Sequence, residues 1–149
     1  MSRTDAGSRL LRRPSRHDLV AFLAFTALIV GTYAVGLGLG VLTGRGLTVH
    51  PVVWEPILFP GLFLLAAPVV AVLNLRTGGT AAGSLAVGLA PGVAFGLLAG
   101  AGTLLGFGPG DSPLWVLVVY FAGVGFVGAL VATALSLVVE RLLGSLVSQ

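Results

Sequence analysis

The sequence predicts an all-α integral membrane protein, a four-transmembrane-helix up-down bundle. Two observations point to this class. Of the 149 residues, 56% are hydrophobic and only 9% are charged, whereas a soluble domain carries about 25% charged residues. Four apolar segments also stand out, each near or above the roughly 20 residues that cross the hydrocarbon core of a bilayer. So few charges could not cover a water-facing surface, and we expect the lipid bilayer to surround the chain.

The four predicted spans follow one another with short, turn-like segments between them. They cover, in order, about 19–42, 52–73, 81–107 and 114–139. Because connections this short bring sequential helices back alongside one another, we expect neighbouring spans to be antiparallel. The spans then make up a single transmembrane domain over residues 18–149, preceded by a basic tail over residues 1–17.

Helix-start signals precede three of the spans. Ser15, followed three residues later by Asp18, fits a capping box at the start of the first span. Pro51 and Pro113 stand where a helix tolerates proline best, at its first position. In this interpretation Asp18 has a local role in the helix cap.

The arginines indicate an orientation. Five of the eight lie in the first sixteen residues. With the N-terminus inside, seven fall on the cytoplasmic side and only Arg45 falls outside, in agreement with the excess of basic residues in cytoplasmic loops. We therefore expect a multi-pass protein of the cell membrane with its N-terminus and C-terminus in the cytoplasm.

The basic tail and the isoelectric point of about 10.7 could also indicate nucleic-acid binding, but a short tail before a span does not favour it. Four arginines are expected instead to contact anionic lipid headgroups: Arg9, Arg12, Arg13 and Arg16.

A cleavable signal peptide is the competing interpretation of the first span. Its apolar run of 24 residues exceeds the apolar region of a signal, which is about 7–15 residues, so we expect the span to be retained.

Glycines recur every four residues in two spans. In water an interior glycine costs a helix about 0.5–1 kcal/mol relative to alanine, but in a bilayer this spacing lets a second helix approach closely. The residues are Gly88, Gly92, Gly96 and Gly100 in the third span, and Gly36, Gly40 and Gly44 in the first. We expect them to pack helices, within one chain or between the subunits of a homo-oligomer. Val87, Pro91 and Phe95 are then expected to face lipid.

An internal repeat is the third feature of the predicted fold. A shift of 62 residues aligns 20–75 with 82–137 without a gap, and fourteen of the 56 aligned positions are identical. Each half holds two spans, which predicts a tandem duplication of a two-helix hairpin with both copies pointing the same way. Chance similarity in a chain rich in glycine, alanine, valine and leucine is the alternative.

Glu55 is the acidic residue that the sequence places within a span, and intramembrane ionisable residues are candidates for function. It lies in the second span, which its prolines make the most irregular: Pro56, Pro60 and Pro68. One interpretation puts Glu55 at the outer surface, paired with Arg45, and the other puts it in a pathway across the membrane. Tyr33, near the centre of the first span, is the remaining candidate for a pathway or an interface.

The sequence contains no recognisable catalytic set. It has no cysteine, and His17 and His50 fall on opposite sides of the predicted membrane, so we expect no metal, no cofactor and no enzymatic activity. The leading hypothesis is a packing, assembly or accessory-subunit role, with a membrane protein or a second copy of the chain as partner and no nucleic acid. The alternative is a small oligomeric transporter or channel that uses the second span and Glu55.

Overall fold

The computed structural model describes residues 13–105 and 113–147. Every regular element in these two ranges is helical. Four helical stretches are long and apolar enough to cross a membrane: Arg16–Leu42, Pro51–Arg76, Ala81–Leu104 and Leu114–Leu146. The predicted all-α class with four apolar helices is therefore confirmed for the described residues.

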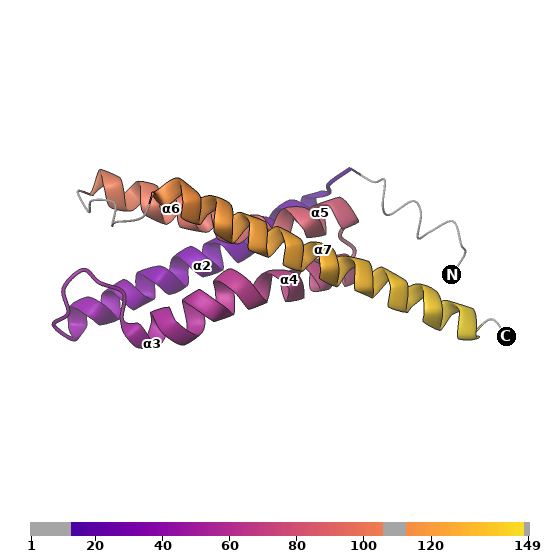
Figure 1. Cartoon of the computed structure of the whole chain (residues 1–149), viewed down its shortest axis with the longest axis horizontal. Coiled ribbons are helices and arrows are strands. Elements are labelled where there is room, and N and C mark those ends of the chain that lie inside the picture. The colour runs from indigo at the N-terminus through magenta and orange to yellow at the C-terminus, as the bar shows by residue number, and fades with distance from the viewer. Residues whose placement is uncertain (1–12, 106–112, 148–149) are drawn as a thin grey trace.

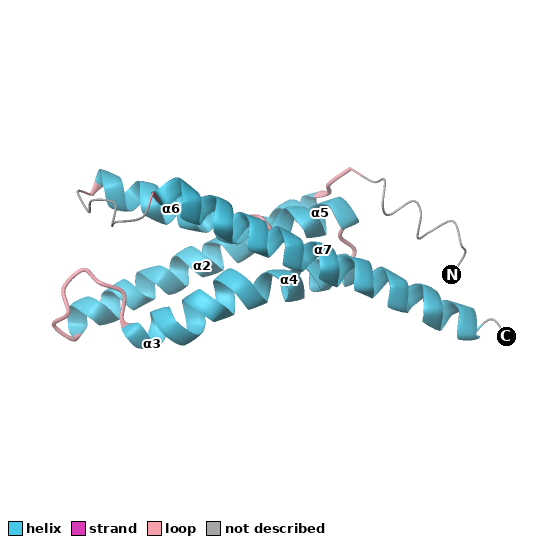
Figure 2. Cartoon of the chain, viewed as in Figure 1, coloured by secondary structure: helices cyan, strands magenta, loops and turns pink. Residues whose placement is uncertain are grey.

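The stretches divide into seven elements: α2 (Arg16–Leu42), α3 (Pro51–Val53), η1 (Trp54–Leu65), α4 (Ala66–Arg76), α5 (Ala81–Val87), α6 (Ala90–Leu104) and α7 (Leu114–Val147). In Figure 1 the chain runs along α2, turns back through α3, η1 and α4, and returns along α5 and α6. Figure 2 shows the short loops that separate these stretches. We call the end that holds the start of α2 and the α4–α5 loop the Asp18 end, and the end that holds the α2–α3 loop the Glu55 end.

Local hydrogen bonds fix both ends of α2. The Ser15 hydroxyl accepts from the Asp18 N–H and the Asp18 carboxylate accepts from the Ser15 N–H, so the predicted capping box is confirmed. At the other end Gly44 adopts a φ of +73°, and the N–H of Arg45 donates to the Gly40 carbonyl at 2.8 Å. This arrangement is a Schellman motif, and it turns the chain back toward α3.

The second stretch departs furthest from α-helical geometry. Residues Trp54–Leu65 form a π-helix, η1, with Pro60 inside it. In a regular α-helix Pro60 would have no N–H to donate, and its ring would clash with the carbonyl of Pro56. Gly61 fits the wider turns, since a Cβ there would lie 3.1 Å from the Pro56 carbonyl oxygen. The prediction that prolines make this span irregular is confirmed.

The third stretch is predicted over about 81–107, and the structure describes it over Ala81–Leu104 with a break inside it. Gly88 and Leu89 separate α5 from α6, and their N–H groups donate to carbonyls three residues back, at 3.0 and 2.9 Å. The cause is Pro91, which lies in the first turn of α6 and has no N–H with which to continue α5. Residues 106 and 107 of the predicted span lie outside the described residues.

The prediction of which face of this stretch contacts lipid is wrong. Val87 and Pro91 are buried, and Phe95 is half-buried against the core. The exposed side carries a row of leucine and valine: Leu89, Val93 and Leu97. Lipid tails accommodate these side chains as well as a protein core does, whereas small residues let helix backbones approach. Small residues such as Gly92 and Ala94 therefore face inward together with Val87 and Pro91, and the row of leucine and valine faces outward.

The fourth stretch, α7, is continuous over 34 residues and ends eight residues beyond the predicted end at 139. One face is buried between residues 121 and 136: Phe121, Gly125, Ala129, Thr133 and Ser136. Helix α7 contacts η1, α4, α5 and α6, so it packs against the second and third stretches. Its last turns carry exposed leucines, and Figure 1 shows them projecting past the Asp18 end.

Aromatic rings fill the core between η1, α6 and α7. Phe63 is fully buried, and its ring centroid lies 4.6 Å from that of Phe121. The ring of Phe95 on α6 lies 5.1 Å from Phe121 in turn. Aromatic pairs at these distances contribute about 0.5–1.5 kcal/mol beyond their buried area. These rings therefore fix the position of α7 against its neighbours.

Candidate functional site

Most of the buried polar side chains in the described residues lie at the Asp18 end. Asp18, in the first turn of α2, is only 3% exposed. Around it lie Asn74 near the end of α4, Thr80 at the start of α5 and Ser84 one turn further on, all of them buried. We call these four residues the Asp18 cluster. It joins the first three helical stretches.

The Asp18 carboxylate accepts five hydrogen bonds. Its Oδ1 accepts from Asn74 Nδ2 at 2.8 Å and from the Thr80 N–H at 2.9 Å. Its Oδ2 accepts from the Ser15 N–H at 2.7 Å, the Ser15 hydroxyl at 3.0 Å and the Thr80 hydroxyl at 2.9 Å. A buried carboxylate without such donors would be very costly, and here N–H and O–H groups from three stretches satisfy it.

The polar groups around Asp18 have defined orientations. Thr80 Oγ1 donates to Asp18 and accepts from the Gly83 N–H at 2.9 Å, which caps α5. Asn74 Nδ2 donates to Asp18 and to Ser84 Oγ, at 2.8 and 3.2 Å. Because an ionised carboxylate only accepts, the Asn74 amide is fixed with its nitrogen toward Asp18 and its oxygen away from it.

Two glycines allow this close packing. A Cβ at Gly83 would overlap the Asp18 carboxylate, and a Cβ at Gly79 would overlap the Asn74 side chain. Gly78 adopts a φ of +105°, and the Gly79 N–H donates to the Asn74 carbonyl at 2.8 Å. A second Schellman motif therefore ends α4 and fits the α4–α5 loop against the first turn of α2.

His17 adds a contact at the rim of the cluster. Its Nε2 lies 2.9 Å from Thr77 Oγ1. The Thr77 hydroxyl donates to the Leu73 carbonyl at 2.8 Å, so we assign the Nε2–H of His17 as the donor to Thr77. The start of α2 and the α4–α5 loop are thus joined both inside the bundle and at its surface.

Three buried oxygen atoms have no hydrogen-bond partner in the described part of the chain: Asn74 Oδ1, Thr133 Oγ1 and Ser136 Oγ. Asn74 is 3% exposed, Thr133 4% and Ser136 7%. Buried polar side chains nearly always have a partner. These oxygens are therefore exceptions, and two of them lie on the inner face of α7.

The sequence predicts only part of the role of Asp18. From sequence, Asp18 caps the first span and Glu55 is the acidic residue within a span. Asp18 in fact belongs to α2 and also bonds Asn74 and Thr80, 56 and 62 residues further along the chain. One sequence feature could have indicated this contact. The three residues all fall near span ends on the same predicted side of the membrane.

The residues predicted for a pathway or an interface lie apart from the cluster. Glu55 is exposed in the first turn of η1, and Arg45 is exposed in the α2–α3 loop. No ion pair between the two is present in the described ranges, so the expected pairing is not formed. Tyr33 is half-buried and packs against the hydrophobic core.

Gly88 and Gly92 lie against α7. A Cβ at Gly88 would lie 2.7 Å from the Gly125 carbonyl oxygen and 2.8 Å from the Ala129 Cβ. A Cβ at Gly92 would overlap Ala122. At these two positions the helix backbones therefore approach each other within one chain.

The rest of the glycine stripe is more open. A Cβ at Gly96 would be in ordinary contact with Val118, at 3.6 Å, and one at Gly100 would meet nothing within 4 Å. The close approach of α6 and α7 is therefore limited to the half of the stripe nearer the Asp18 end.

The glycines of the first span accommodate the returning loop. A Cβ at Gly40 would overlap the Thr48 carbonyl, and one at Gly36 would lie 2.6 Å from Val49 Cγ1. Gly44 lies beyond the end of α2, where a Cβ would meet nothing within 4 Å. Its positive φ serves the turn, and no helix packs against it.

Two of the four arginines expected at lipid headgroups, Arg9 and Arg12, lie outside the described residues. Arg13 and Arg16 are exposed at the Asp18 end. Their contact with an anionic surface stays a prediction.

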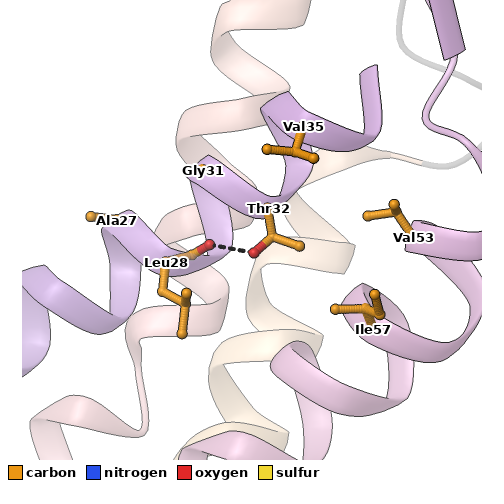
Figure 3. A pocket seen from close by; sticks show the side chains of 7 residues that line it. All are labelled: Ala27, Leu28, Gly31, Thr32, Val35, Val53 and Ile57. Carbon is orange, nitrogen blue, oxygen red and sulfur yellow. Dashed lines mark hydrogen bonds between the residues drawn. The ribbon is translucent and has the colours of Figure 1, made fainter. Parts of the chain in front are cut away.

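An open apolar groove of about 430 Å³ lies between α2 and the segment formed by α3 and η1. Figure 3 shows the side chains that line it: Ala27, Leu28, Gly31, Thr32, Val35, Val53 and Ile57. The hydroxyl of Thr32 donates to the Leu28 carbonyl at 2.8 Å. The groove therefore offers hydrocarbon, with no free side-chain donor, to whatever contacts it.

No protein-family model matches this chain, and no curated protein or solved structure matches it. Within the described ranges, no group of three or more histidine, cysteine, aspartate or glutamate side chains could hold a metal ion. The chemistry that the Asp18 cluster offers is that of one carboxylate, an amide and several hydroxyl groups in a buried setting.

Proposed function

We propose that this chain is a multi-pass protein of the cell membrane with a packing, assembly or accessory-subunit role and no catalytic activity. In this proposal the four helical stretches cross the bilayer as an up-down bundle, with the Asp18 end and both termini on the cytoplasmic side. The arginines support this orientation, since Arg13, Arg16 and Arg76 lie at the Asp18 end and Arg45 at the other.

The distribution of buried polar side chains is the observation that supports the assembly role. Among the described residues they lie at the Asp18 end, apart from Thr26, whose hydroxyl donates to the Phe22 carbonyl at 2.9 Å. The middle of the bundle is filled by side chains such as Ile29 and Phe63. Among the described residues a polar solute would find few polar groups there, since the hydroxyl of Thr26 is already bonded. All four stretches present large apolar side chains outward, to lipid or to a partner helix.

Two contacts support the tandem duplication. Asp18 bonds Thr80, and the rings of Phe59 and Phe121 lie 6.3 Å apart. Both pairs are separated by 62 residues, which is the period of the repeat. In two copies related by an axis along the membrane normal, equivalent residues meet at that axis. The two halves of the repeat differ most between the second stretch, which contains a π-helix, and its counterpart α7, which is an α-helix.

Cysteine labelling tests the orientation without background, because the chain has no cysteine of its own. Leu47→Cys places a thiol in the exposed α2–α3 loop, and Thr77→Cys places one in the exposed α4–α5 loop. A membrane-impermeant reagent should label the first variant in intact cells and the second only after permeabilisation. The reverse pattern would contradict the proposed orientation.

Photo-crosslinking in native membranes tests the assembly role. A photoreactive amino acid is placed at exposed positions on different helices, Leu28, Leu97 and Leu135, and at the buried Ile29 as the control beside Leu28. We expect a protein adduct of one defined mass from one face and lipid adducts from the others. Lipid adducts alone from every exposed position would contradict the proposal.

A second candidate function is a small oligomeric transporter or channel that uses the second span and Glu55, and η1 is the observation that favours it. π-Helical turns within α-helices are frequent at functional sites, and Glu55 lies in the first turn of η1. The test is proton and sodium flux into liposomes, with Glu140→Gln as the control for Glu55→Gln because Glu140 is an exposed carboxylate on α7. Flux that only Glu55→Gln reduces would favour transport, and no flux would remove this candidate.

A further inference from the structure

We propose that Asn74, Thr133 and Ser136 form a binding site for a small monovalent cation such as Na⁺ at the Asp18 end of the bundle. Their three oxygens are the buried side-chain atoms that no described group satisfies. The site lies where α4, α5 and α7 meet. It goes beyond the assembly role, which requires no ligand.

The packing of α5 against α7 sets the level of Thr133, by which we mean its position along the axis of the bundle. Gly88 lies against Ala129, since a Cβ at Gly88 would be 2.8 Å from the Ala129 Cβ. These two helices run in opposite directions in Figure 1. The residue four positions before Gly88 therefore lies level with the residue four positions after Ala129, which pairs Ser84 with Thr133. Because Asn74 Nδ2 donates to Ser84 Oγ, Thr133 lies level with the Asn74 amide.

The packing of α4 against α7 gives the same level independently. Gly128 lies against Pro68, because a Cβ at Gly128 would be 3.5 Å from the proline ring. Figure 1 shows these helices running in the same direction, and each advances about 1.5 Å per residue. Asn74, six residues after Pro68, is therefore level with position 134, which lies between Thr133 and Ser136.

The hydroxyls of Thr133 and Ser136 share one buried face of α7 because residues three apart on a helix are neighbours. Several helical threonine hydroxyls donate to the carbonyl four residues back, as those of Thr32 and Thr103 do. Thr133 and Ser136 make no such bond. Together with Asn74 Oδ1, they leave three oxygens with free lone pairs in one buried region.

Asp18 supplies negative charge to this region through Asn74. Its own oxygens already accept five hydrogen bonds, all from neutral donors, so it does not bind the ion directly. By donating to Asp18, the Asn74 amide is polarised and its Oδ1 becomes more negative. Unpaired oxygens near a buried carboxylate whose described hydrogen-bond donors are all neutral favour a cation. Divalent ions generally take more charged ligands than this single carboxylate.

Thermal unfolding of the full chain in detergent tests the site, with sodium chloride compared with choline chloride at equal ionic strength. An ion that binds the folded state stabilises it in proportion to its occupancy, so we expect a saturable upward shift of the wild-type Tm with sodium. Thr133→Val and Ser136→Ala each remove one oxygen and should lose this shift. In choline both variants should unfold at or above the wild-type Tm, because each deletes an unsatisfied buried group.

Thr103→Val is the matched control. Thr103 is exposed on α6 and its hydroxyl already bonds the Ala99 carbonyl at 2.9 Å, so this variant should keep the sodium-dependent shift. Retention of radioactive sodium by the purified protein, lost in Thr133→Val, provides a second readout. An equal wild-type response to sodium and choline, or a sodium response that both Thr133→Val and Ser136→Ala retain, would overturn the site and favour a buried water at these oxygens.

Discussion

Asp18 and Thr80, 62 residues apart in the chain, bond through both the N–H and the hydroxyl of Thr80, each at 2.9 Å. The first residue lies at the start of α2 and the second at the start of α5. Hydrogen bonds to a charged group contribute about 1.5–3 kcal/mol each. This pair therefore holds the first and third helical stretches at a fixed relative depth.

Asp18→Asn should destabilise the folded chain. The substitution keeps the shape of the side chain but replaces one acceptor oxygen with an N–H donor, which faces groups that also donate. Each buried donor left unpaired costs about 1–3 kcal/mol, so we expect a lower free energy of unfolding in denaturant titrations. Glu55→Gln, at an exposed carboxylate, should change it little. Equal stability of Asp18→Asn and the wild type would show that the Asp18 cluster does not hold the bundle together.

Gly92→Ala and Gly100→Ala should have opposite effects on stability. A Cβ at Gly92 would overlap Ala122 on α7, whereas one at Gly100 would meet nothing within 4 Å. Overpacking costs about 1–3 kcal/mol, and alanine is favoured over glycine within a helix by about 0.5–1 kcal/mol. The Tm in detergent should therefore fall for Gly92→Ala and hold or rise for Gly100→Ala. A fall at Gly100 instead would indicate a partner that packs against the Glu55 end of the stripe.

Gly78→Ala should destabilise the α4–α5 loop. Gly78 has a φ of +105°, a region that L-residues avoid, and even the left-handed helical region costs them about 1–2 kcal/mol. Gly31→Ala, within α2 and with no atom within 4 Å of its Cβ position, is the control and should be neutral or stabilising. Hydrogen exchange of the amides of residues 77–80 should speed up in Gly78→Ala alone. Unchanged exchange there would mean that the turn is set by something other than this glycine.

A disulfide should form between Pro68→Cys and Gly128→Cys within one chain. The Cβ that residue 128 would carry lies 3.8 Å from the Pro68 Cβ, which matches the spacing of about 3.8 Å in disulfides. Val69→Cys with Val127→Cys, adjacent positions that are both exposed, should not form one. Non-reducing electrophoresis and peptide mapping distinguish an intrachain bond from a dimer. A dimer from the first pair alone would place this contact between chains and contradict the packing of α4 on α7.

The four apolar helices could be predicted because hydropathy depends on composition over about 20 residues and on no other part of the chain. The orientation of each helix could not. Val87 faces inward and Leu89 faces outward, yet both are apolar, and lipid does not distinguish them. Pro60 indicates irregularity in η1, but one proline does not predict a π-helix of twelve residues.

The hydrogen bonds of Asp18 within its own helix cap could be predicted from the sequence. Its hydrogen bonds to the other helices could not. The bond between Ser15 and Asp18 spans three residues and has a sequence signature. The bonds to Asn74 and Thr80 depend on how three helices align along their axes. The unpartnered oxygens of Thr133 and Ser136 depend further on the rotation of α7. No spacing rule for a single helix contains that information.

Asn74 and Thr80 lie far from Asp18 in the sequence. This constrains the order in which the hydrogen bonds of Asp18 form during synthesis of the chain. Ribosomes make the amino-terminal part first, so Ser15 is beside Asp18 before Asn74 and Thr80 can reach the carboxylate. Until Asn74 and Thr80 pack against the start of α2, water or other polar molecules must satisfy the carboxylate. The arrival of α5 displaces those molecules. The packing of the third stretch therefore completes the burial of Asp18 at the start of the first.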